Sequence, residues 1–491
     1  MSAECWPYAR TGGLGEAVST LARHQLLGGQ EAVVVMPLYR VVRDAYQLET
    51  VGEPFAVSLG GRAERVTVQR LTGASDAAAA PSVFFVAHAD FTERAGLYGE
   101  DGVDYADNGR RFALFSAAAL AALPNIAPNA SVVHAHDWHA ALTIAYLRTT
   151  FARSDRYRRL GAVLSVHNAA YQGHSGPDTL PDLGLAPTLY DWRWFEWFGR
   201  TNLLKGSLAF ADMVTTVSPT HAEELRSELG GFGLHGTFLD LGDRLRGIVN
   251  GIDQCVWDPR TDGHLPARYS HENLLGKRRC KSALQEAFGL PVRADAPLVA
   301  MCARLTAQKG FDLLLESSLL RDHTTASRLR RDVQVAILGR GEERFARLLS
   351  ERASACPDRV AVRLDFTDEL EHLLMAGADM CLVPSLFEPC GLTQMRAQRY
   401  GAIPIAHRVG GLADTIDDGV SGFLFTPYAA PAFEASLDRS LMRFADTPWW
   451  RQMMRAAMRR DFGWARSVRE YCEVYRRAVA VRTSSESGRT R

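Results

Sequence analysis

The feature that most constrains the fold of this chain is a sustained alternation of short apolar runs with longer amphipathic segments. Ten runs rich in β-branched residues predict strands, at 32–36, 83–86, 132–135, 163–166, 214–217, 298–302, 333–338, 360–364, 380–383 and 403–406. Helices are predicted over 16–26, 107–123, 140–148 and 194–209, and others begin near 310, 342, 370, 392 and 412. Near-continuous apolar strands separated by amphipathic helices are typical of parallel sheets covered on both faces. The pattern therefore predicts an α/β fold with two doubly wound, Rossmann-like domains.

The two predicted domains meet near residues 247–257, where a short β-like segment is followed by the turn-rich sequence D-P-R-T-D-G. A length of 491 residues also favours two domains over one. We assign residues 1–247 to an N-terminal domain and residues 248–461 to a C-terminal domain. The last residues, 481–491, are mostly polar and are predicted to form a disordered tail.

Charge and cysteine content argue against several classes of protein. The 56 Lys and Arg residues equal the 56 Asp and Glu residues, and this zero net charge argues against a nucleic-acid or anionic-membrane partner. The eight cysteines include no CxxC pair, which argues against a zinc framework or a disulfide scaffold and fits a reducing compartment. No apolar stretch is long enough to span a bilayer. We therefore expect a soluble, cytoplasmic protein.

The segment R-T-G-G-L-G-E at residues 10–16 is the first candidate binding feature. Its glycines, Gly12, Gly13 and Gly15, let the backbone turn tightly and approach a ligand closely. The N-terminus of the helix that follows offers N–H groups and a positive dipole end to an anion. A glycine-rich turn is weak evidence alone, and a plain loop leading into a helix is the alternative.

A similar construction follows the strand predicted at 380–383. Glu388 precedes the turn Cys390-Gly391-Leu392-Thr393, which leads into another helix. The N–H groups at that helix start would face the carboxyl ends of the strands, where open α/β sheets bind ligands. Glu388 could accept hydroxyl groups of a sugar or ribose; alternatively, it caps the helix.

Lys309 stands out because only four of the 56 basic residues are lysines, namely Lys205, Lys277, Lys281 and Lys309. It lies five residues after Arg304, across the loop that follows the strand at 298–302, so both cations can reach one crevice. Such a pair suits a diphosphate, because each charge-assisted hydrogen bond contributes roughly 1.5–3 kcal/mol. The alternative is two solvated charges.

Polar side chains also end two strands of the first half. H-A-H-D-W-H at 134–139 closes one strand, and S-V-H-N at 165–168 closes the next. We expect Asp137, His167 and Asn168 to reach the same rim, where they can bind a hydroxylated ligand. His134 and His136 lie on one face of their strand, so a metal site is an alternative, as is a purely structural role. Neither a nearby cysteine nor an H-E-x-x-H sequence supports a metal.

Other catalytic patterns do not compete with these. The chain contains neither a G-x-S-x-G sequence nor a G-x-x-x-x-G-K-[ST] sequence. Two helix starts suited to anions and an Arg/Lys pair favour a nucleotide-diphosphate ligand between two Rossmann-like domains that face an interdomain cleft. The hydroxyl-binding side chains favour a sugar on that nucleotide.

The same residues lie in motifs that resemble the bacterial glycogen synthases and plant starch synthases. The motifs run along nearly the whole chain: T-G-G-L-G at 11–15, H-D-W-H at 136–139, H-N-A-A-Y-Q-G at 167–173, T-V-S-P-T at 216–220, N-G-I-D at 250–253, R-L-T-A-Q-K-G at 304–310, E-P-C-G-L-T-Q at 388–394, R-Y-G-A-I-P at 399–404 and R-V-G-G-L-A-D-T at 408–415. One such motif is weak evidence, but the set in this order is specific. The resemblance implies the GT-B fold, and segment 462–480 resembles the helix that returns to the N-terminal domain.

The resemblance also implies an activity. Members of the family transfer glucose from ADP-glucose to the non-reducing 4-hydroxyl group of an α-1,4-glucan such as glycogen, with retention of configuration and without a metal ion. By this comparison Arg304 and Lys309 hold the diphosphate, and Glu388 positions the donor glucose. His167 and Asp137 contact hydroxyl groups near the reacting carbon. The further binding residues implied are Arg10, Gly12, Gly13, Gly15, Asn168, Asn250, Cys390, Gly391, Leu392 and Thr393.

The chain departs from the family pattern near its first motif. Met1 comes almost directly before Ala3-Glu4, so we expect the first strand of the N-terminal sheet to be missing, which would leave backbone groups unpaired. Arg10 replaces a Lys and Glu16 replaces an Asp. Arg396 stands where related retaining transferases often carry a second Glu, which this family generally lacks too. Two alternatives remain: a catalytically impaired glucan-binding paralogue, and a retaining GT-B transferase that uses another nucleotide sugar.

Overall fold

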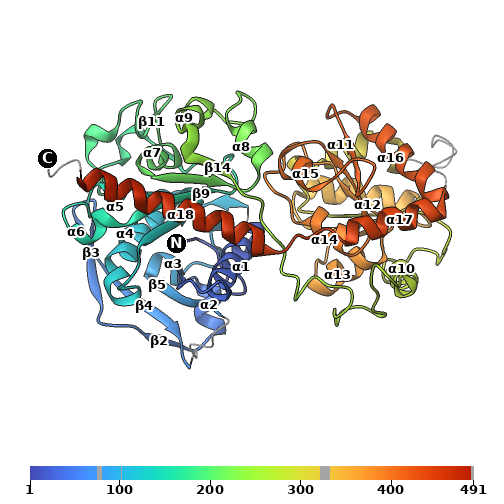
Figure 1. The fold of residues 1–491 in the computed structure, drawn as a ribbon, viewed down its shortest axis with the longest axis horizontal. Coiled ribbons are helices and arrows are strands. Elements are labelled where there is room, and N and C mark those ends of the chain that lie inside the picture. Colours follow the sequence, from blue (N-terminus) through green and yellow to red (C-terminus); the bar gives the residue numbers. More distant parts are fainter. Residues whose placement is uncertain (74–79, 101, 321–331, 488–491) are drawn as a thin grey trace. The chain divides into compact units, whose positions relative to one another are not determined.

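The computed structural model describes residues 1–73, 80–100, 102–320 and 332–487, and the chain divides into two compact units (Figure 1). Unit 1 comprises Met1–Asn250 together with the chain from Trp464 onward, and unit 2 comprises Gly251–Gly463. The boundaries expected from the sequence, after 247 and after 461, each lie a few residues earlier. Each unit has its own hydrophobic core.

Unit 2 is built on a parallel sheet whose strands pair in the order β17-β16-β15-β18-β19-β20. The strands are β15 (Leu298–Cys302), β16 (Gln334–Leu338), β17 (Val360–Arg363), β18 (Met380–Val383), β19 (Ile403–His407) and β20 (Phe423–Phe425). Numbered within the unit, this order is 3-2-1-4-5-6, the arrangement of doubly wound dinucleotide-binding domains. The order reverses between β15 and β18, and ligands of such sheets bind at the carboxyl ends of the strands at that point.

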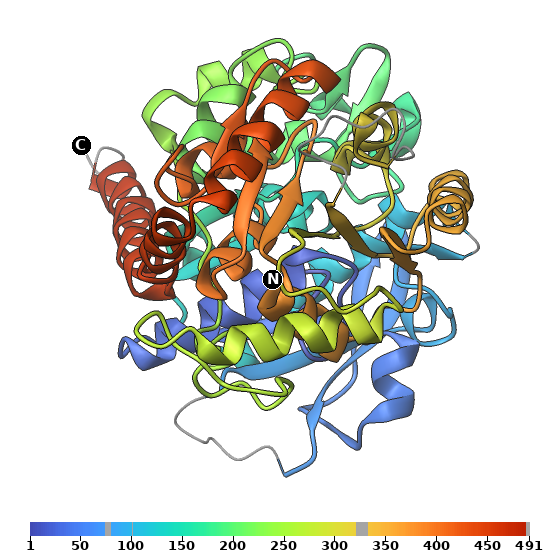
Figure 2. The same cartoon turned by 90° about the vertical axis from the view of Figure 1, so that its right-hand side faces the viewer.

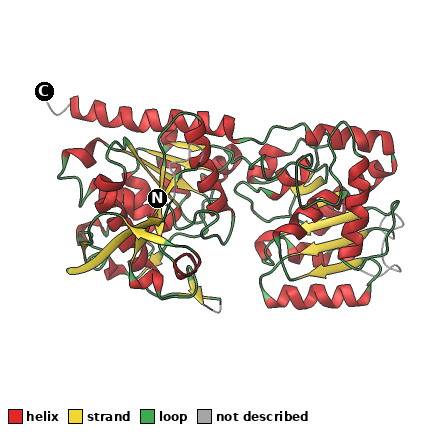
Figure 3. Ribbon diagram, turned by 90° about the horizontal axis from the view of Figure 1, so that it is seen from below, coloured by secondary structure: helices red, strands yellow, loops and turns green. Residues whose placement is uncertain are grey.

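The helices of unit 2 lie on both sides of its sheet (Figure 3). They are α10 (Leu275–Ala287), α11 (Phe311–Glu316), α12 (Glu343–Ala355), α13 (Asp368–Gly377), α14 (Thr393–Arg399), α15 (Gly410–Thr415), α16 (Ala430–Ala445) and α17 (Thr447–Met458). On α17 the buried positions Trp450, Met453, Met454 and Ala457 follow the spacing of one helical face. Strands β15 and β16 are buried along their whole length, which is why they are near-continuous apolar runs in the sequence.

Unit 1 contains two larger sheets. The first pairs β1 (Val33–Pro37), β5 (Ser82–Ala87), β4 (Arg62–Leu71) and β2 (Leu48–Thr50) in that order, and β3 (Phe55–Leu59) also pairs with β4. The second is parallel and pairs β14 (Leu245–Gly247), β13 (Met213–Thr216), β9 (Gly161–Val166) and β8 (Val132–His136). The antiparallel strands β2, β3 and β4 were not predicted, because their alternating polar residues do not give continuous apolar runs.

Met1 and Ser2 bridge the two sheets. The Ser2 N–H donates to the Val35 carbonyl of β1 over 3.0 Å, and the Met1 carbonyl accepts from the His136 N–H of β8 over 3.0 Å. The Met1 amino group donates to the His134 carbonyl over 2.6 Å. Among the described residues, Met1 and Ser2 thus contact both β1 and β8. Backbone groups of both strands are therefore partly satisfied by these two residues.

The helices of unit 1 connect and cover these sheets. They are α1 (Gly13–Leu27), α2 (Arg40–Ala45), α3 (Ala89–Thr92), α4 (Asn108–Ile126), α5 (Asp137–Arg148), α6 (Asp155–Arg159), α7 (Leu203–Phe210), α8 (Pro219–Leu225), α9 (His235–Asp240) and α18 (Trp464–Ser487). Helix α18 runs along unit 1 (Figures 1 and 2), where Trp464 and Tyr471 pack with Leu21 of α1 and Val163 of β9.

The prediction of a disordered tail from 481 is wrong as far as Ser487. Helix α18 continues to that residue, and Arg482 forms an ion pair with the fully buried carboxylate of Asp212. This contact could not be predicted, because polar composition alone does not reveal a buried partner for one arginine. Residues 488–491 lie outside the described residues.

The helix predicted over 194–209 is wrong in its first half. Only Leu203–Phe210 is helical, and the preceding residues form a hairpin of β11 (Glu196–Trp197) and β12 (Arg200–Asn202). Phe198 and Gly199 have φ angles of 48° and 75°, a left-handed conformation that turns the chain and ends any helical path. Short strands β10 (His174–Ser175), β6 (Gly99–Glu100) and β7 (Val103–Asp104) were also not predicted.

None of the described helices is both long enough and apolar enough to cross a membrane.

Candidate active site

Lys309 and Glu388 meet at the reversal point of the sheet in unit 2. Lys309 lies on the loop after β15 and Glu388 on the loop after β18, and the distance between Lys309 Nζ and Glu388 Oε2 is 2.5 Å. Glu388 is only 7% exposed, so its carboxylate depends on the ammonium group for compensation of its charge. Both residues lie where a doubly wound sheet binds its ligand.

Ser385 fixes the carboxylate of Glu388 from a second direction. Its hydroxyl group donates to Glu388 Oε2 over 2.8 Å, and its carbonyl oxygen lies 2.9 Å from Nδ1 of His407 at the end of β19. The orientation of Glu388 is therefore set by the ends of two neighbouring strands, β18 and β19.

The turn after Glu388 has a conformation that requires glycine at position 391. Gly391 has a φ angle of 72°, and a Cβ atom there would lie 2.3 Å from Oε1 of Gln394. The Gln394 side chain donates to the carbonyl groups of Cys390 and Gly391 over 3.0 and 2.8 Å. Leu392 precedes the first residue of α14, Thr393, so the predicted helix start is present directly after Glu388.

Gly310 brings the loop of Lys309 against the loop of Glu388. Its φ angle is 81°, and a Cβ atom there would lie 2.1 Å from the carbonyl oxygen of Pro384. The Leu386 N–H donates to the Gln308 carbonyl over 2.9 Å, which ties the two loops together. Arg304, on the loop of Lys309, is exposed to solvent.

In unit 1 the buried carboxylate of Glu4 organises the glycine-rich turn. Glu4 is 2% exposed and accepts from the N–H and the hydroxyl group of Thr11 over 2.9 and 2.6 Å. The Tyr98 hydroxyl group donates to the same carboxylate over 2.7 Å. Helix α1 then begins at Gly13, with Gly12 as its N-cap residue. At Gly15 a Cβ atom would lie 2.9 Å from the carbonyl oxygen of Ala9, so this close packing requires glycine.

Arg10, at the start of the glycine-rich turn, lies over an aromatic ring. Its guanidinium carbon is 4.0 Å from the centre of the Trp6 ring. A planar guanidinium group stacks on an aromatic face in a way that a compact ammonium group does not. Trp6 therefore gives a physical reason for Arg at this position.

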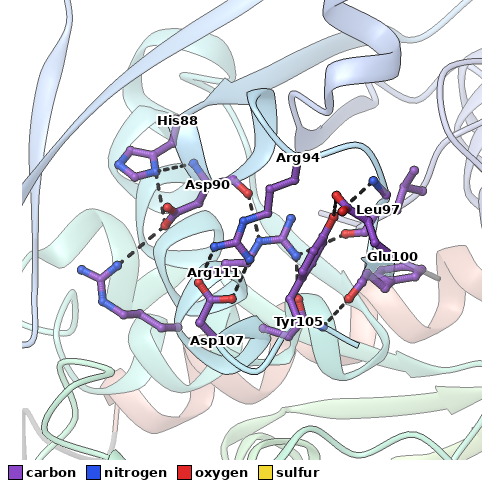
Figure 4. Close-up of polar contacts among 12 residues, drawn as sticks. His88, Asp90, Arg94, Leu97, Glu100, Tyr105, Asp107 and Arg111 are labelled. Atoms are coloured by element: carbon purple, nitrogen blue, oxygen red, sulfur yellow. Dashed lines mark hydrogen bonds and ion pairs between the residues drawn. The ribbon is translucent and has the colours of Figure 1, made fainter. Parts of the chain in front are cut away.

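A polar network holds the segment that carries Tyr98 (Figure 4). Arg94 forms a two-bond ion pair with Asp107, each N–O distance being 2.6 Å, and Tyr105 donates to Glu100 over 2.6 Å. Arg111 is fully buried and donates to the carbonyl groups of Asp90 and Leu97 over 3.0 and 3.3 Å. These contacts fix both ends of the segment, so the position of Tyr98 against Glu4 is set by the fold.

Asp137 is the first residue of α5 and has a φ angle of 56°, which is unusual for a residue other than glycine. Its Oδ1 atom accepts from the N–H of His167 over 2.7 Å and from the N–H of Asn168 over 3.4 Å. Burial raises the pKa of Asp137 from 3.8 to about 7, although these two N–H groups act in the opposite direction. The three rim residues expected from the sequence thus lie together, and the carboxylate titrates near neutrality.

The histidines of this rim form a partly buried chain of contacts. His136 Nδ1 lies 3.0 Å from His167 Nε2, and His134 contacts the hydroxyl groups of Ser165 and Tyr475 over 2.6 and 2.9 Å. Burial lowers the pKa of His167 to about 4, so its ring is neutral at physiological pH. Among the residues that the structure describes, no group of three His, Cys, Asp or Glu side chains is arranged to hold a metal ion.

Two further residues of the sequence analysis have defined positions. Asn250, the last residue of unit 1 before the boundary, is 6% exposed, and its Oδ1 atom has no hydrogen-bond partner among the described residues. Arg396 forms an ion pair of 2.6 Å with buried Glu371 and lies 4.2 Å from the centre of the Trp257 ring. Arg396 thus belongs to the interior of unit 2.

Sequence reasoning did not assign Glu4, Tyr98 and Ser385 to the site. Glu4 carried a usable signal, because it is a lone carboxylate in the short apolar run directly before the glycine-rich turn. Ser385, three residues before Glu388, is also close in sequence to a predicted site residue. Tyr98 had no such signal, since its contact with Glu4 joins residues 94 positions apart.

Two Rossmann-like units, one of them with a Lys/Glu pair and a helix start at its reversal point, define a nucleotide-sugar glycosyltransferase of the GT-B class. The chain matches the model of the starch synthase catalytic domain over residues 1–240 and that of the group 1 glycosyl transferases over residues 285–443. The chain belongs to the glycogen and starch synthase family.

Individual relatives agree with this assignment along the whole chain. A glycogen synthase of Syntrophotalea carbinolica is 38% identical, with 98% of each chain covered, and one of Anaeromyxobacter sp. (strain Fw109-5) is 41% identical, with 98% of this chain and 99% of the relative covered. The catalytic domain of starch synthase IV from Arabidopsis thaliana, solved with ADP and acarbose bound, is 30% identical, with a TM-score of 0.87 and 98% of each chain covered. The sucrose-phosphate synthase of Thermosynechococcus elongatus has the same fold, with a TM-score of 0.59, 17% identity, and 96% of this chain and 94% of that chain covered.

Proposed function

We propose that this protein is a glycogen synthase that transfers glucose from ADP-glucose to the non-reducing 4-hydroxyl group of an α-1,4-glucan and retains the α configuration. The curated relatives named above are glycogen synthases, and the solved starch synthase relative holds ADP together with the oligosaccharide analogue acarbose. The observation that carries the proposal is the Lys309–Glu388 pair at the reversal point of unit 2.

Unit 2 contributes the donor-binding groups in this proposal. Lys309 exchanges part of its contact with Glu388 for the diphosphate, and Arg304, exposed on the same loop, adds a second positive charge. The turn at Cys390–Thr393 directs the positive end of α14 to the phosphates. Glu388 then accepts hydrogen bonds from hydroxyl groups of the donor glucose. Because these cationic side chains neutralise the leaving group, we propose that the transfer needs no metal ion.

Unit 1 contributes the groups around the acceptor and the reacting carbon. The bond between C1 of glucose and the diphosphate oxygen breaks, and the acceptor's O4 forms the new bond on the same face. The proton of that hydroxyl group passes to the leaving phosphate oxygen. Ionised Asp137 accepts sugar hydroxyl groups and stabilises the positive charge that develops at C1, and His167 contacts the primary hydroxyl side. Arg10, the glycine-rich turn, Asn168 and Asn250 complete the proposed binding set.

The stereochemistry of the product tests the proposal. The purified protein is incubated with ADP-glucose labelled at C1 and with maltotriose, and the anomeric signals of the product are followed by carbon NMR. We expect the new bond to appear only as α-1,4. Label in a β-linked product, or release of free glucose without transfer, would contradict a retaining glycogen synthase.

The same assay, repeated with UDP-glucose and GDP-glucose and combined with a measurement of glycogen binding, separates the two alternatives. A catalytically impaired glucan-binding paralogue binds glycogen but forms no labelled product from any donor. A transferase for another nucleotide sugar forms the product from UDP-glucose or GDP-glucose and not from ADP-glucose. The intact hydrogen bonding between Glu4 and Thr11, next to Arg10, favours an active enzyme over the first alternative.

A further inference from the structure

Residues 191–200 of unit 1, called here the 191–200 segment, present two large aromatic side chains to solvent. Trp192 is 71% exposed and Phe198 is 81% exposed, whereas Phe195 between them is fully buried. The Arg193 guanidinium carbon lies 5.8 Å from the centre of the Trp192 ring, and Phe198 contacts Trp197. Single exposed apolar residues are common, but two rings so exposed on one short segment leave a large apolar area in water. Nothing in the proposed donor or acceptor site uses either ring.

Phe198 also occupies a backbone position that does not suit it. It is the first of the two turn residues between β11 and β12, and both turn residues, Phe198 and Gly199, have positive φ angles of 48° and 75°. Hairpin turns of this kind favour Asn-Gly, since Asn and Gly adopt the left-handed region more easily than bulky residues do. The Phe198 ring meets the Trp197 ring edge to face, with ring centres 5.0 Å apart, yet this contact leaves Phe198 81% exposed and does not offset the unfavourable backbone position. Such departures from local preference are concentrated at functional sites.

The segment that carries the rings is firmly attached to unit 1. Phe195 packs against Gly206, where a Cβ atom would approach the Phe195 ring to 2.2 Å, and Trp194 stacks on Phe210 with ring centres 4.8 Å apart. Lys205 anchors the backbone, because its Nζ atom donates to the carbonyl group of Trp192 and, over 3.1 and 2.8 Å, to those of Trp194 and Glu196. A compact ammonium group can donate to three carbonyl groups that converge on one point, whereas the donors of a guanidinium group are spread over a plane.

The segment is also joined to the chain that leaves the acceptor rim. Strand β12 pairs with β10, and the Asn202 amide group donates to the Gln172 side chain over 2.6 Å, five residues after His167. The exposed rings are therefore carried by a hairpin that is hydrogen-bonded to the chain leaving His167. Arg193 is neutralised by Asp191, with an N–O distance of 2.8 Å, so the exposed surface around Trp192 favours an uncharged ligand over an anionic one.

We propose that the 191–200 segment is a second glucan-binding surface, on which Trp192 and Phe198 stack against glucose units of an α-1,4-glucan away from its reacting end. The apolar C–H face of a glucose ring fits the electron-rich face of an aromatic ring, and this contact removes both apolar surfaces from water. Rigid presentation of the rings lowers the ordering cost of binding a flexible polymer. The choice of ligand rests on the proposed function, because it is the glucan acceptor of that reaction.

The variants Phe198→Asn and Trp192→Ala test this surface, with Leu229→Ala as the matched control. Leu229 is 95% exposed and lies in unit 1 outside the segment. For each protein we measure binding to glycogen by affinity electrophoresis without donor, KM for glycogen and for ADP-glucose, kcat/KM with maltotriose, and Tm. Glycogen binding without donor is informative even if the enzyme proves inactive.

We expect each aromatic variant to bind glycogen about three- to tenfold more weakly and to raise KM for glycogen by a similar factor. In the aromatic variants, KM for ADP-glucose and kcat/KM with maltotriose stay as in the parent protein. In the control variant, all measured values stay as in the parent protein. Phe198→Asn should also raise Tm, because Asn relieves the left-handed strain; a packing role for Phe198 would instead lower Tm.

Three outcomes would overturn the inference: unchanged glycogen binding in both aromatic variants, a lower Tm for Phe198→Asn, or a kcat/KM that falls by the same factor with maltotriose as with glycogen. The last would place the rings in the reacting site. Failure of the proposed function is distinct, since it appears as absence of glucose transfer by the parent protein.

Discussion

The substitution Asp137→Asn should separate the stability of unit 1 from its activity. Asp137 is buried, has a positive φ angle of 56° and has a pKa raised to about 7. Asn has nearly the same shape, tolerates the left-handed conformation and keeps an oxygen atom that can accept from the His167 N–H. The change therefore removes the negative charge while leaving the local backbone in place.

The size of the pH effect on the free energy of unfolding follows from the pKa values of Asp137 in the folded and unfolded states. The unfolded carboxyl group titrates near 3.8 and the folded one near 7, so between these values the folded state binds more protons. The free energy of unfolding then falls as pH rises, by about 1.4 kcal/mol per pH unit well below the folded pKa and less steeply near it, so about 2 kcal/mol is lost between pH 5 and pH 7. The stabilising contribution is thus present at low pH and is lost as pH rises through the folded pKa.

The side-chain amide of the Asp137→Asn variant does not titrate, so the variant avoids this loss. We expect the difference in unfolding free energy, variant minus parent, to grow by about 3 kcal/mol between pH 5 and pH 8, which corresponds to several degrees in the midpoint of unit 1. The catalytic activity of the parent should instead rise with pH, because it depends on the ionised form of Asp137. The kcat/KM of the parent falls about tenfold per pH unit below about 7, and the variant has a lower plateau without this acidic limb.

Differential scanning calorimetry at pH 5 and pH 8, together with kcat/KM for ADP-glucose over the same range, provides the measurement. The His167 ring titrates near 4 in the folded state and near 6.5 in the unfolded state, so it also changes stability in this window, but it does so equally in parent and variant and cancels in their difference. A stability difference that is independent of pH, or an acidic limb near pH 7 that persists in the variant, would refute the assignment of the charge to Asp137.

Three further predictions concern the donor side. Lys309→Met should lower kcat by about 10- to 150-fold, the loss of one charge-assisted hydrogen bond of about 1.5–3 kcal/mol, while glycogen binding stays within twofold; equal losses of both would contradict a role at the diphosphate. Gly310→Ala should lower the free energy of unfolding by more than about 2 kcal/mol in a urea titration, because its Cβ atom would meet the Pro384 carbonyl oxygen at 2.1 Å and φ is 81°; an unchanged midpoint would show that the loop can shift. Excess EDTA should leave the rate of glucose transfer unchanged, and a loss restored by added Mg²⁺ or Mn²⁺ would contradict transfer without a metal ion.

The sequence predicted best those elements whose burial leaves a continuous apolar run. β15 and β18 begin and end where the pattern placed them, and the α/β fold, the GT-B class and the family are confirmed. The hairpin at Glu196–Asn202 was mistaken for a helix, because the aromatic spacing around Phe195 fits both structures. Only the left-handed pair Phe198-Gly199 decides between them.

The site residues could be predicted only where charged or polar side chains lie on the loop directly after a predicted strand. Lys309 and Glu388 were identified in this way, and the structure places them in contact, although their roles and those of the other site residues stay predictions. Contacts between distant segments, such as Glu4 with Tyr98, depend on tertiary structure and leave no local signal.

The scarcity of lysine proved to be a useful guide to structure. Lys277 donates to the carbonyl groups of Ala376 and Tyr400, each over 2.9 Å, at the ends of α13 and α14. Lys281 binds the Ala296 carbonyl over 2.6 Å and forms an ion pair of 2.7 Å with Asp379. Lys205 likewise contacts three carbonyl groups, whereas Lys309 contacts the Glu388 carboxylate. Arginine, whose donors are fixed in a plane, cannot replace lysine there without moving its partners.

Donor preference is the most direct test of the central claim. Initial rates of glucose incorporation into glycogen are measured with ADP-glucose, UDP-glucose and GDP-glucose at equal concentrations, with the parent protein and with Lys309→Met. We predict transfer from ADP-glucose at a rate at least tenfold above the other donors, and a strong reduction of that rate in Lys309→Met. Transfer only from UDP-glucose, or no transfer from any of the three donors, would contradict the claim that this protein is an ADP-glucose-dependent glycogen synthase.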